Sequence, residues 1–597
     1  MKVLFFSPFA NIWEHAFPEA LIAESFAQKT IDIEAVRCGR MLQSHCVAMS
    51  AVGVGADAPL ATKLQVCAGC EKRRDLITDQ MHFPSLIMDA WVRTEDRVEI
   101  DRLMEGIGPS TWQSLHVDGV PLGRFAIYEM WLNSKLVSTD LSPSMWQLYL
   151  GQLRNTLLSY FAGRRILQDR RPDAVVVYND HYSVNHAFCA AAEKLGIPTY
   201  TIHGGHHIIR RAETMMMSAS GHTMEDVFHS EAWMSYQRHP IGGGEIALVG
   251  EHFSGLLQAN SAFAYSSRFE GTDAAVLRRR LGIADGAPVL LAAMSSEDEL
   301  IGVRLIDAIP ETTQESLFAD QFEWIDELFG YARQHPQVHL VLRLHPRMFP
   351  NKREQILSPV VARIMALRDG APANVTFNMP SDGIGLYDLM QVVDVLLNFR
   401  SSVGAELSAF GIPVVVPSNS DFFTYPGELN RIGHTVGEFR EQIDRAIQEG
   451  WSLENVRRAF RWYAFLFGRL AVDFSDAVSS RPVAIRPKKP GLRLRLYNWA
   501  AFVFLQYGPL VRERLALRRR ELAPASAALL LDVIEGHLGD VSESALWPAE
   551  TATLEDETAA LSSYLIGIAE TLWVDIRQPD SLAERIRDHL TSDVARS

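Results

Sequence analysis

The chain has 597 residues, 47% of them hydrophobic and 22% charged, and its formal net charge is −15. One hydrophobic core does not support this length, so we expect two or three domains. The excess of acidic residues argues against a general nucleic-acid-binding protein, and the composition is that of an ordinary globular protein. A local site can still bind a charged ligand.

The cytoplasm is the expected location of this chain. The apolar run Lys2–Phe6 is too short for a signal peptide, and Pro8 follows it closely. The sequence has no run of 18 or more apolar residues, so we expect no transmembrane helix. Five cysteines in this length do not suggest a secreted disulfide scaffold.

Residues 1–37 are expected to open a Rossmann-like unit. Lys2–Phe6 predicts a buried strand, Trp13–Phe26 has apolar residues at helical spacing, and Ile31–Val36 predicts a second strand. The loop after the first strand lies at its carboxyl end, where ligands bind in open α/β sheets. His15 in this loop is a candidate site residue; the alternative is a histidine that only caps or packs.

Four of the five cysteines fall in a long insertion, residues 38–70. Cys67 and Cys70 form a Cys-x-x-Cys pair. Two further thiols would complete a tetrahedral, all-thiolate site with them: Cys38 and Cys46. We expect a structural metal here, with zinc ahead of an iron–sulfur cluster. Free buried thiols and a redox disulfide remain as alternatives, because the spacing of the first pair is not that of a standard metal site.

A second βαβ unit follows a mostly helical stretch. Met145–Leu167 predicts an amphipathic helix, and residues 172–181 predict a central strand that ends in polar residues. Ser183–Leu195 then predicts a helix, and residues 196–207 predict the next strand and its loop.

Polar side chains end both of these strands: Asp180, His181 and His203. Because the carboxyl ends of adjacent parallel strands face one cleft, we expect these side chains to lie together. Alternatively, Asp180 and its neighbour cap the next helix, which does not exclude a catalytic role. His206 and His207 follow, but no carboxylate at a suitable spacing suggests a metal site there.

Residues 208–285 are expected to finish the N-terminal domain. The methionine run 215–217 suits core or loop filling better than a cofactor site. Residues 246–252 predict a short strand that ends at Gly250.

The second half of the chain predicts another doubly wound unit. It begins with a strand from Val289 that ends in small polar residues. Strands and helices then alternate, with strands at 339–344, 374–378, 393–398 and 413–416 and helices around 324–331, 386–392 and 401–410. Further helices are expected between Val436 and Ala477.

The stretch 338–417 carries the main functional signal. Two buried strands end in Arg-Leu-His-Pro (343–346) and Arg-Ser-Ser-Val-Gly (400–404), and the second runs through a turn into a short helix. Hydroxyls and backbone amides at such a turn favour an anion, so the sequence predicts a phosphate site at the carboxyl edge of a parallel sheet. The alternatives are a turn capped by His345 and an ordinary helix cap for the serines.

These motifs, followed by Gly-Ile-Pro-Val-Val (411–415), resemble those of the bacterial capsule and surface-polysaccharide glycosyltransferases. The resemblance is greatest to the Kdo-transferase and sialyltransferase-like enzymes, which use CMP-activated sugars. The CDP-glycerol glycerophosphotransferases share a similar pattern. The resemblance implies the α/β architecture called GT-B, in which two Rossmann-like domains face each other across a cleft, here with a helical C-terminal extension.

The resemblance also implies roles for individual residues. His345 would contact the nucleotide phosphate and assist departure of the leaving group, as a general acid or an electrostatic stabiliser. Ser401 and Ser402 would hold the phosphate. The same motifs supply further donor-site candidates: Arg343 or Arg400 as positive charge, Gly404 in the turn, and Glu406 on a ribose hydroxyl.

The acceptor base is expected from the N-terminal domain. Asp180 is the first choice because a carboxylate can take a proton from a sugar hydroxyl, and His203 and His15 are the alternatives. The implied partners are a nucleotide-sugar donor and a glycan or lipid-linked acceptor, without nucleic acid. We expect no catalytic metal.

The C-terminal part differs in character. Between residues 486 and 520 the chain has ten Lys or Arg and one acidic residue, Glu513. Apolar and aromatic residues flanked by cations suit the inner surface of an anionic membrane, which fits a lipid-linked acceptor. The alternative is a basic amphipathic helix docked on this acidic protein. Residues 521–597 are acidic and predict helices.

The predicted domains follow from these elements. They are an acceptor domain with the cysteine-rich insertion (1–280), a nucleotide-sugar donor domain (281–440), helices that pack back across both (441–484), and the basic segment with its acidic tail (485–597). The function that the sequence favours is transfer of a sugar from a nucleotide donor, with CMP favoured, in capsule or lipopolysaccharide biosynthesis. The alternatives are a CDP-glycerol-type phosphotransferase and a non-catalytic scaffold of the same fold.

Overall fold

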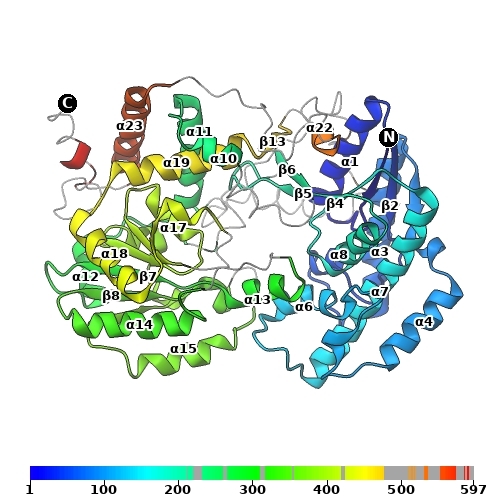
Figure 1. Ribbon diagram of the computed structural model, residues 1–597, viewed down its shortest axis with the longest axis horizontal. Helices are drawn as coiled ribbons and strands as arrows, with labels where there is room; N and C mark the ends of the chain where they lie inside the picture. Colours follow the sequence, from blue (N-terminus) through cyan, green and yellow to red (C-terminus); the bar gives the residue numbers. More distant parts are fainter. Residues whose placement is uncertain are drawn as a thin grey trace, which may run out of the picture. The chain divides into compact units, whose positions relative to one another are not determined.

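A computed structural model of the chain shows its fold (Figure 1). The structure describes residues 1–211, 213–219, 231–259, 265, 267–308, 316–351, 355–418, 424–475, 510, 513–514, 517, 530–535, 552–572, 584, 586 and 588–590. Contacts divide the described residues into two compact units. Unit 1 takes those within 1–223, 301–308 and 469–546, and unit 2 takes those within 224–300, 309–468 and 547–597.

Unit 1 is built on a seven-stranded sheet with the strand order β13-β6-β5-β4-β1-β2-β3. Its strands are β1 (Lys2–Phe6), β2 (Asp32–Arg37), β3 (Ser85–Ile87), β4 (Ala174–Tyr178), β5 (Thr199–Gly204), β6 (Thr214–Ala219) and β13 (Val472–Asp473). The first five are parallel, whereas β6 and β13 run antiparallel. The order 3-2-1-4-5 of the parallel strands is that of a Rossmann fold, so this prediction is confirmed.

Successive residues of β1 feed two separate cores. Val3 and Phe5 pack in one core with residues of α1, and Leu4 and Phe6 pack in the other with residues of α7 and α8. A strand buried on both faces is continuously apolar, which explains the run Val-Leu-Phe-Phe. The predicted core role of the methionine run is also confirmed, because Met215, Met216 and Met217 lie buried in β6.

Helices cover both faces of this sheet (Figure 1). They are α1 (Trp13–Gln28), α2 (Val47–Ser50), α3 (Leu60–Met81), α4 (Thr94–Glu105), α5 (Leu122–Phe125), α6 (Tyr128–Ser134), α7 (Pro143–Arg170), α8 (Ser183–Lys194) and α22 (Leu530–Ile534), with the 3-10 turns η1 (Met88–Trp91) and η2 (Trp112–Ser114). The long helix α7 begins after an N-cap residue, Ser142, whose hydroxyl accepts from the Met145 amide at 3.3 Å. Pro143 occupies the first turn, where proline is favoured.

Unit 2 is built on a six-stranded, fully parallel sheet with the order β12-β11-β10-β7-β8-β9. Its strands are β7 (Val289–Ala293), β8 (His339–Arg343), β9 (Val375–Asn378), β10 (Val395–Asn398), β11 (Val414–Pro417) and β12 (Arg431–Gly433). Counted from β7, this is the complete Rossmann order 3-2-1-4-5-6. The chain therefore contains two Rossmann-like domains, as predicted.

The helices of unit 2 lie between and around these strands. They are α10 (Glu231–Tyr236), α11 (Gly243–Leu257), α12 (Ala274–Leu281), α13 (Glu297–Leu305, counted with unit 1 from residue 301), α14 (Gln321–Gln334), α15 (Val360–Arg368), α16 (Leu386–Leu389), α17 (Val403–Ser408), α18 (Val436–Glu449), α19 (Leu453–Gly468) and α23 (Leu554–Leu572), with the 3-10 turns η3 (Pro346–Met348), η4 (Pro380–Asp382) and η5 (Gly427–Leu429).

One sequence-based prediction is wrong: residues 246–252 do not form a strand but the middle of helix α11. Ile246, Val249 and Phe253 recur at helical spacing and are buried. The Phe253 ring lies 5.0 Å from that of Tyr463 in α19. This packing places residues 243–257 in unit 2, although the predicted domain boundary was residue 280.

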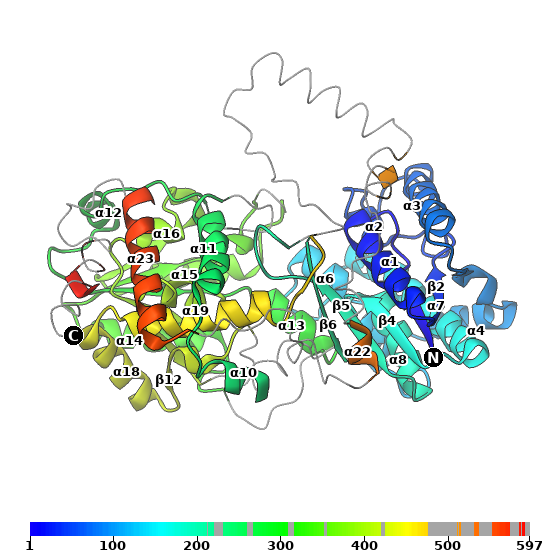
Figure 2. The same ribbon diagram turned by 90° about the horizontal axis from the view of Figure 1, so that it is seen from above.

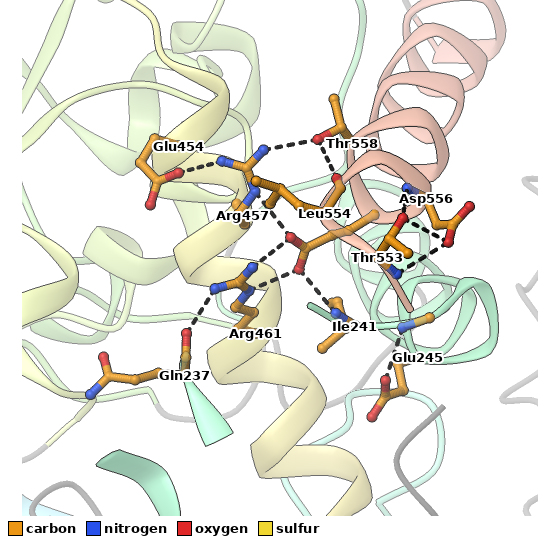
Figure 3. A network of polar contacts seen from close by, with 12 residues as sticks. Gln237, Ile241, Glu245, Glu454, Arg457, Arg461, Thr553, Leu554, Asp556 and Thr558 are labelled. Atoms are coloured by element: carbon orange, nitrogen blue, oxygen red, sulfur yellow. Dashed lines mark hydrogen bonds and ion pairs between the residues drawn. The ribbon is translucent and has the colours of Figure 1, made fainter. Parts of the chain in front are cut away.

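The C-terminal helix α23 is anchored in unit 2 beside α11 and α19 (Figure 2). Its Glu557 is fully buried and accepts two hydrogen bonds from Arg461, at 2.8 and 2.6 Å, and one from the Ile241 amide at 3.1 Å. Arg457 lies 3.0 Å away on the same side (Figure 3). A buried carboxylate needs partners of this kind. These contacts therefore hold α23, which belongs to the acidic tail, against unit 2.

The predicted basic segment between residues 486 and 520 lies outside the described residues except at four positions. Within the part of the chain that the structure describes, no helix is both long and apolar enough to cross a membrane. Contact with a membrane surface stays a prediction.

Candidate functional site

The loops after β7 and β10 meet at the carboxyl edge of the unit 2 sheet. These two strands are neighbours, with Ala293 opposite Asn398, and the strand order reverses between them. Ligands of open α/β sheets bind at such a reversal, outside the carboxyl ends of the strands. Here the Arg400 amide donates to the Ser295 hydroxyl at 3.1 Å, which joins the two loops.

His345 follows the next strand, β8, at the same edge. Its Nδ1 accepts from the Arg347 amide at 3.3 Å and so caps the 3-10 turn η3. A neutral imidazole has one donor and one acceptor nitrogen, so this cap assigns the ring proton to Nε2. The capping alternative is therefore observed, and in this tautomer Nε2 is the donor nitrogen of the ring, which is the kind of group that a departing phosphate needs.

A buried ion pair, which was not predicted, holds this histidine loop in place. Arg347 and Asp298 have only 6% and 5% of their side chains exposed, and they lie 2.8 Å apart. Arg347 also donates to the Tyr265 hydroxyl at 3.3 Å. Because Asp298 lies just after β7 and Arg347 just after β8, the pair ties together two strand-end loops.

The two serines of the predicted phosphate turn face different partners. Ser401 Oγ accepts from the Val403 amide at 3.4 Å, while Ser402 donates to Glu406 Oε1 at 3.0 Å. Glu406 Oε2 accepts from Tyr387 at 2.9 Å. Burial raises the pKa of the Glu406 carboxyl, and both of its oxygens have partners within the protein. This carboxylate is thus built to brace the turn, in addition to any contact with a ribose.

Gly404 has a packing reason to be glycine. A Cβ at this position would lie 1.7 Å from the Tyr425 hydroxyl and 2.6 Å from Asn398 Nδ2. Tyr425 and Asn398 hydrogen-bond each other at 2.9 Å, and Asn398 Nδ2 donates to the Ser401 carbonyl at 2.7 Å. The missing side chain lets this buried network reach the turn that carries the serines.

The side chains of the two candidate arginines, Arg343 and Arg400, lie in different places. Arg343 points toward β9, where it donates to Asn378 and, at 3.1 Å, to the Ile384 carbonyl. Burial lowers its pKa to about 10 although Tyr387 and Asp388 favour the charged form. Arg400 lies in the loop at the strand-order reversal, with its guanidinium 4.4 Å from the Phe399 ring centre. Of the two, Arg400 is the one at the reversal.

The corresponding edge of unit 1 gathers aromatic rings and histidines. The His15 ring stacks on Tyr178 with centroids 3.9 Å apart, and His203 lies 5.8 Å beyond Tyr178. His206 continues the row at 6.2 Å from His203. Burial lowers the pKa of His15 and of His203 to about 4, so both rings are neutral at neutral pH.

His203 and Asp180, the predicted bases, lie at the ends of adjacent strands. His203 Nδ1 is 2.8 Å from the Gly204 carbonyl, which can only accept, so the ring proton is on Nδ1 and Nε2 has the lone pair of a base. Asp180 is buried, with His181 Nε2 3.8 Å from its carboxylate. Its predicted role as a helix cap is taken by Glu129, which accepts from the Ser183 amide at 2.9 Å.

Glu19 is a further polar group at this edge that sequence reasoning missed. It lies on the buried face of α1, is 4% exposed, and accepts a hydrogen bond from Ser7 directly after β1. Arg37 donates to the Ser7 carbonyl at 3.2 Å. Burial raises the pKa of Glu19 to about 7, against the opposing effects of Ser7 and Arg37. The sequence feature that could have pointed to Glu19 was a glutamate among the apolar residues of α1.

The four clustered cysteines lie in unit 1 and line one cavity. Burial raises the pKa of Cys38 to about 12 and that of Cys70 to about 11. Among the described residues, no group of three or more His, Cys, Asp or Glu side chains is arranged so that it could hold a metal ion. The predicted zinc therefore stays a prediction.

Comparison with known proteins adds little to this geometry. No family model matches the chain, and no curated protein matches it. The UDP-GlcNAc 2-epimerase of Neisseria meningitidis is 14% identical over 75% of this chain and 92% of its own, with a TM-score of 0.22. The glycosyltransferase SnogD of Streptomyces nogalater is 14% identical over 79% and 96%, with a TM-score of 0.23.

MurG of Acinetobacter baumannii is 13% identical over 78% of this chain and 94% of its own, with a TM-score of 0.22. TM-scores this low carry no argument. The assignment of two Rossmann-like domains rests instead on the strand order of each unit.

Proposed function

We propose that the chain is a glycosyltransferase that moves a sugar from a nucleotide-activated donor to a glycan acceptor. The observation that carries the proposal is the carboxyl edge of unit 2, where Ser295, Ser401 and His345 follow three adjacent strands around a strand-order reversal. Hydroxyls, an arginine and an imidazole donor at this place suit the phosphate of a nucleotide.

In this proposal, unit 2 binds the donor. Ser401 and Arg400 hold the phosphate, and His345 donates its Nε2 proton in a hydrogen bond to the phosphate oxygen as the sugar bond breaks. Such a positioned donor contributes about 10²–10⁴ to the rate of comparable reactions. A CMP-sugar is favoured as the donor, on the resemblance of the residues 343–346 and 401–406 to capsule and surface-polysaccharide transferases.

Unit 1 would supply the acceptor's base. His203 Nε2 has the lone pair that removes a proton from a sugar hydroxyl, and the adjacent Asp180 can stabilise the imidazolium that forms. Asp180 itself remains the second candidate for the base. The acceptor would be a surface glycan or its lipid-linked precursor, in capsule or lipopolysaccharide biosynthesis, reached from the cytoplasmic face of the membrane.

The test is a donor panel with the full-length protein. CMP-sugars, UDP-sugars and CDP-glycerol are each incubated with the chain and a glycan acceptor, and release of the nucleotide is measured. Turnover of a CMP-sugar is expected. Turnover of CDP-glycerol alone would replace the proposal by a phosphotransferase, and a chain that neither turns over nor is stabilised thermally by any donor would be a scaffold.

A further inference from the structure

The three serine hydroxyls at the carboxyl edge of unit 2, those of Ser295, Ser401 and Ser402, are not equivalent. A hydroxyl has one proton to donate and lone pairs that accept. Where a neighbouring protein group uses one of these roles, the other role is what the hydroxyl presents to a ligand. All three residues are at least partly exposed. Their hydrogen bonds within the protein therefore determine what each can offer to a nucleotide donor.

Ser295 and Ser401 present a proton. The Arg400 amide donates to Ser295 Oγ at 3.1 Å, and the Val403 amide donates to Ser401 Oγ at 3.4 Å. A backbone amide can only donate, so the serine oxygen is the acceptor in both contacts. The proton of each hydroxyl is then available to a ligand. Phosphate oxygens are strong acceptors, so these two hydroxyls suit a phosphate.

Ser402 has the opposite arrangement. Its hydroxyl donates to Glu406 Oε1 at 3.0 Å, and the Tyr387 hydroxyl donates to Oε2 at 2.9 Å. Burial raises the pKa of Glu406, and these two hydrogen bonds act against that rise, since they favour the carboxylate. Tyr387 keeps its proton at neutral pH, because burial and the nearby Glu406 raise its pKa well above its usual value. With its proton directed at the carboxylate, Ser402 presents the lone pairs of its oxygen.

An oxygen that presents lone pairs calls for a donor on the ligand. A phosphate is a poor partner here, because Glu406 lies directly behind Ser402 and charges of the same sign repel. The groups of a nucleotide sugar that can donate next to the phosphate are hydroxyls, on the ribose at one side and on the transferred sugar at the other. Neighbouring serines of one turn can thus read different parts of the same donor.

We propose that Ser402 accepts a hydrogen bond from a hydroxyl of the nucleotide donor, while Ser295 and Ser401 donate to its phosphate. Glu406 is a positioning residue in this scheme, because it fixes the direction of the Ser402 proton without touching the donor. The resemblance in sequence gives both serines of the turn to the phosphate, whereas here their roles differ. The inference rests on the proposed function, since it divides the work within the same donor site.

The experiment compares the full-length wild-type chain with S402A by calorimetric titration. The ligands are CMP, UMP, the 2′-deoxy and 3′-deoxy forms of each, and CMP-N-acetylneuraminate. If the ribose supplies the hydroxyl, S402A should weaken CMP or UMP about 3–10-fold and leave unchanged the analogue that lacks that hydroxyl. If the transferred sugar supplies it, S402A should weaken only the CMP-sugar. S401A is the matched control, and it should weaken all of these ligands by the same factor because all have the phosphate.

E406Q tests the positioning role without touching the ligand. A glutamine side chain has one acceptor oxygen and one donor nitrogen. The Tyr387 hydroxyl is 1% exposed and needs that oxygen, whereas the exposed Ser402 can turn its proton to water. The amide nitrogen should therefore face Ser402 and reverse the direction of its proton. We expect E406Q to lose the preference for the ligand with the hydroxyl and to keep the affinity for the ligand without it.

The possible failures of this inference and of the proposed function are distinct. If S402A weakened nucleotides with and without the hydroxyl equally, Ser402 would contact the phosphate, and the inference would be overturned while the proposed function stood. The same holds if S402A changed no affinity, or if E406Q kept the wild-type preference. If the wild-type chain bound none of these nucleotides, the proposed function would fail and this inference with it.

Discussion

The carboxyl edges of the two sheets share a strand order but differ in the side chains that gather there. At the unit 2 edge, Arg400 lies in the loop of the strand-order reversal, and Arg347 lies buried just after β8. At the unit 1 edge, His15 and His203 are uncharged at neutral pH, because burial lowers the pKa of each to about 4. The strand order decides where a site lies, and the strand-end residues decide what it binds.

This difference matches two kinds of ligand. An edge with cationic groups and hydroxyls suits a phosphate, whereas neutral imidazoles and tyrosine rings suit the hydroxyls and apolar face of a sugar. Four changes, taken from the largest expected effect to the smallest, test whether the two edges differ in this way.

Replacing His345 should have the largest effect. An asparagine can still cap η3, but its amide is not an acid and its donor nitrogen lies closer to the backbone than Nε2 does, so H345N should keep its stability and lose about 10²–10⁴ of its turnover. Nucleotide release under saturating donor measures this. His335, at the end of α14 before β8, provides the matched control: H335N should retain wild-type turnover. Full turnover in H345N would remove the leaving-group role.

Breaking the Arg347–Asp298 pair tests the fixed charge of unit 2. R347M leaves Asp298 buried without its cation, which typically costs about 3–5 kcal/mol of unfolding free energy. Denaturant unfolding measures the loss. Arg363 and Asp320 form an exposed pair at 3.5 Å in the same unit, and R363M should cost about 1 kcal/mol or less. Equal losses in the two variants would show that the buried pair has no special role.

The raised pKa of Glu19 predicts how the stability of unit 1 depends on pH. The unfolded carboxyl loses its proton near pH 4.5 and the folded one near pH 7. Between these values the folded state holds the extra proton, so its stability falls as the pH rises, by about 3 kcal/mol for this group. E19Q should remove the contribution of Glu19 to this fall of stability with rising pH.

The measurement is unfolding free energy at a series of pH values from 4 to 8. E14Q, on the exposed face of the same helix, should keep the wild-type slope. Glu129 contributes in the same range, since burial raises its pKa to about 7 as well, so a residual slope is expected in E19Q. If E19Q had the same slope as the wild-type chain, Glu19 would not titrate between pH 4.5 and 7 in the folded state.

The smallest expected effect comes from Y178F. A phenylalanine preserves the stack with His15 but removes the hydroxyl that accepts from the Gly204 amide at 3.2 Å. We expect a loss of about 1 kcal/mol in a thermal or denaturant melt. Y200F on β5 removes a weaker contact, 3.4 Å to the Ile534 carbonyl, and should cost less. The reverse order would show that the hydroxyl of Tyr178 does not help to join β4 to β5.

Much of the fold follows from local patterns. Nine of the thirteen described strands were predicted to within a few residues, because a strand buried on both faces is a short apolar run that ends at polar residues. The strands β3, β6, β12 and β13 were not predicted, and β13 lies in the stretch 436–477, where only helices were expected. Residues 246–252 were wrongly predicted as a strand, because a short apolar run is compatible with either a strand or a helix. Only the contact of Phe253 with α19 settles it.

The candidate site was predicted less completely. His345 and Ser401 stood out because they follow strands directly, which is visible in the sequence. Glu19 and the pairing of Asp298 with Arg347 did not, because their meaning comes from partners 12 and 49 residues away. Likewise, nothing local shows that Gly404 leaves room for Tyr425.

By itself, the sequence determined that this is a two-domain α/β protein with polar strand ends, because periodicity and strand-end chemistry are local properties. Only the tertiary structure decided which strand ends are neighbours, which cysteines share a cavity, and which side chains are buried away from water. Burial and pairing are properties of contacts between distant segments. They are therefore what sets the different side-chain environments of the two edges.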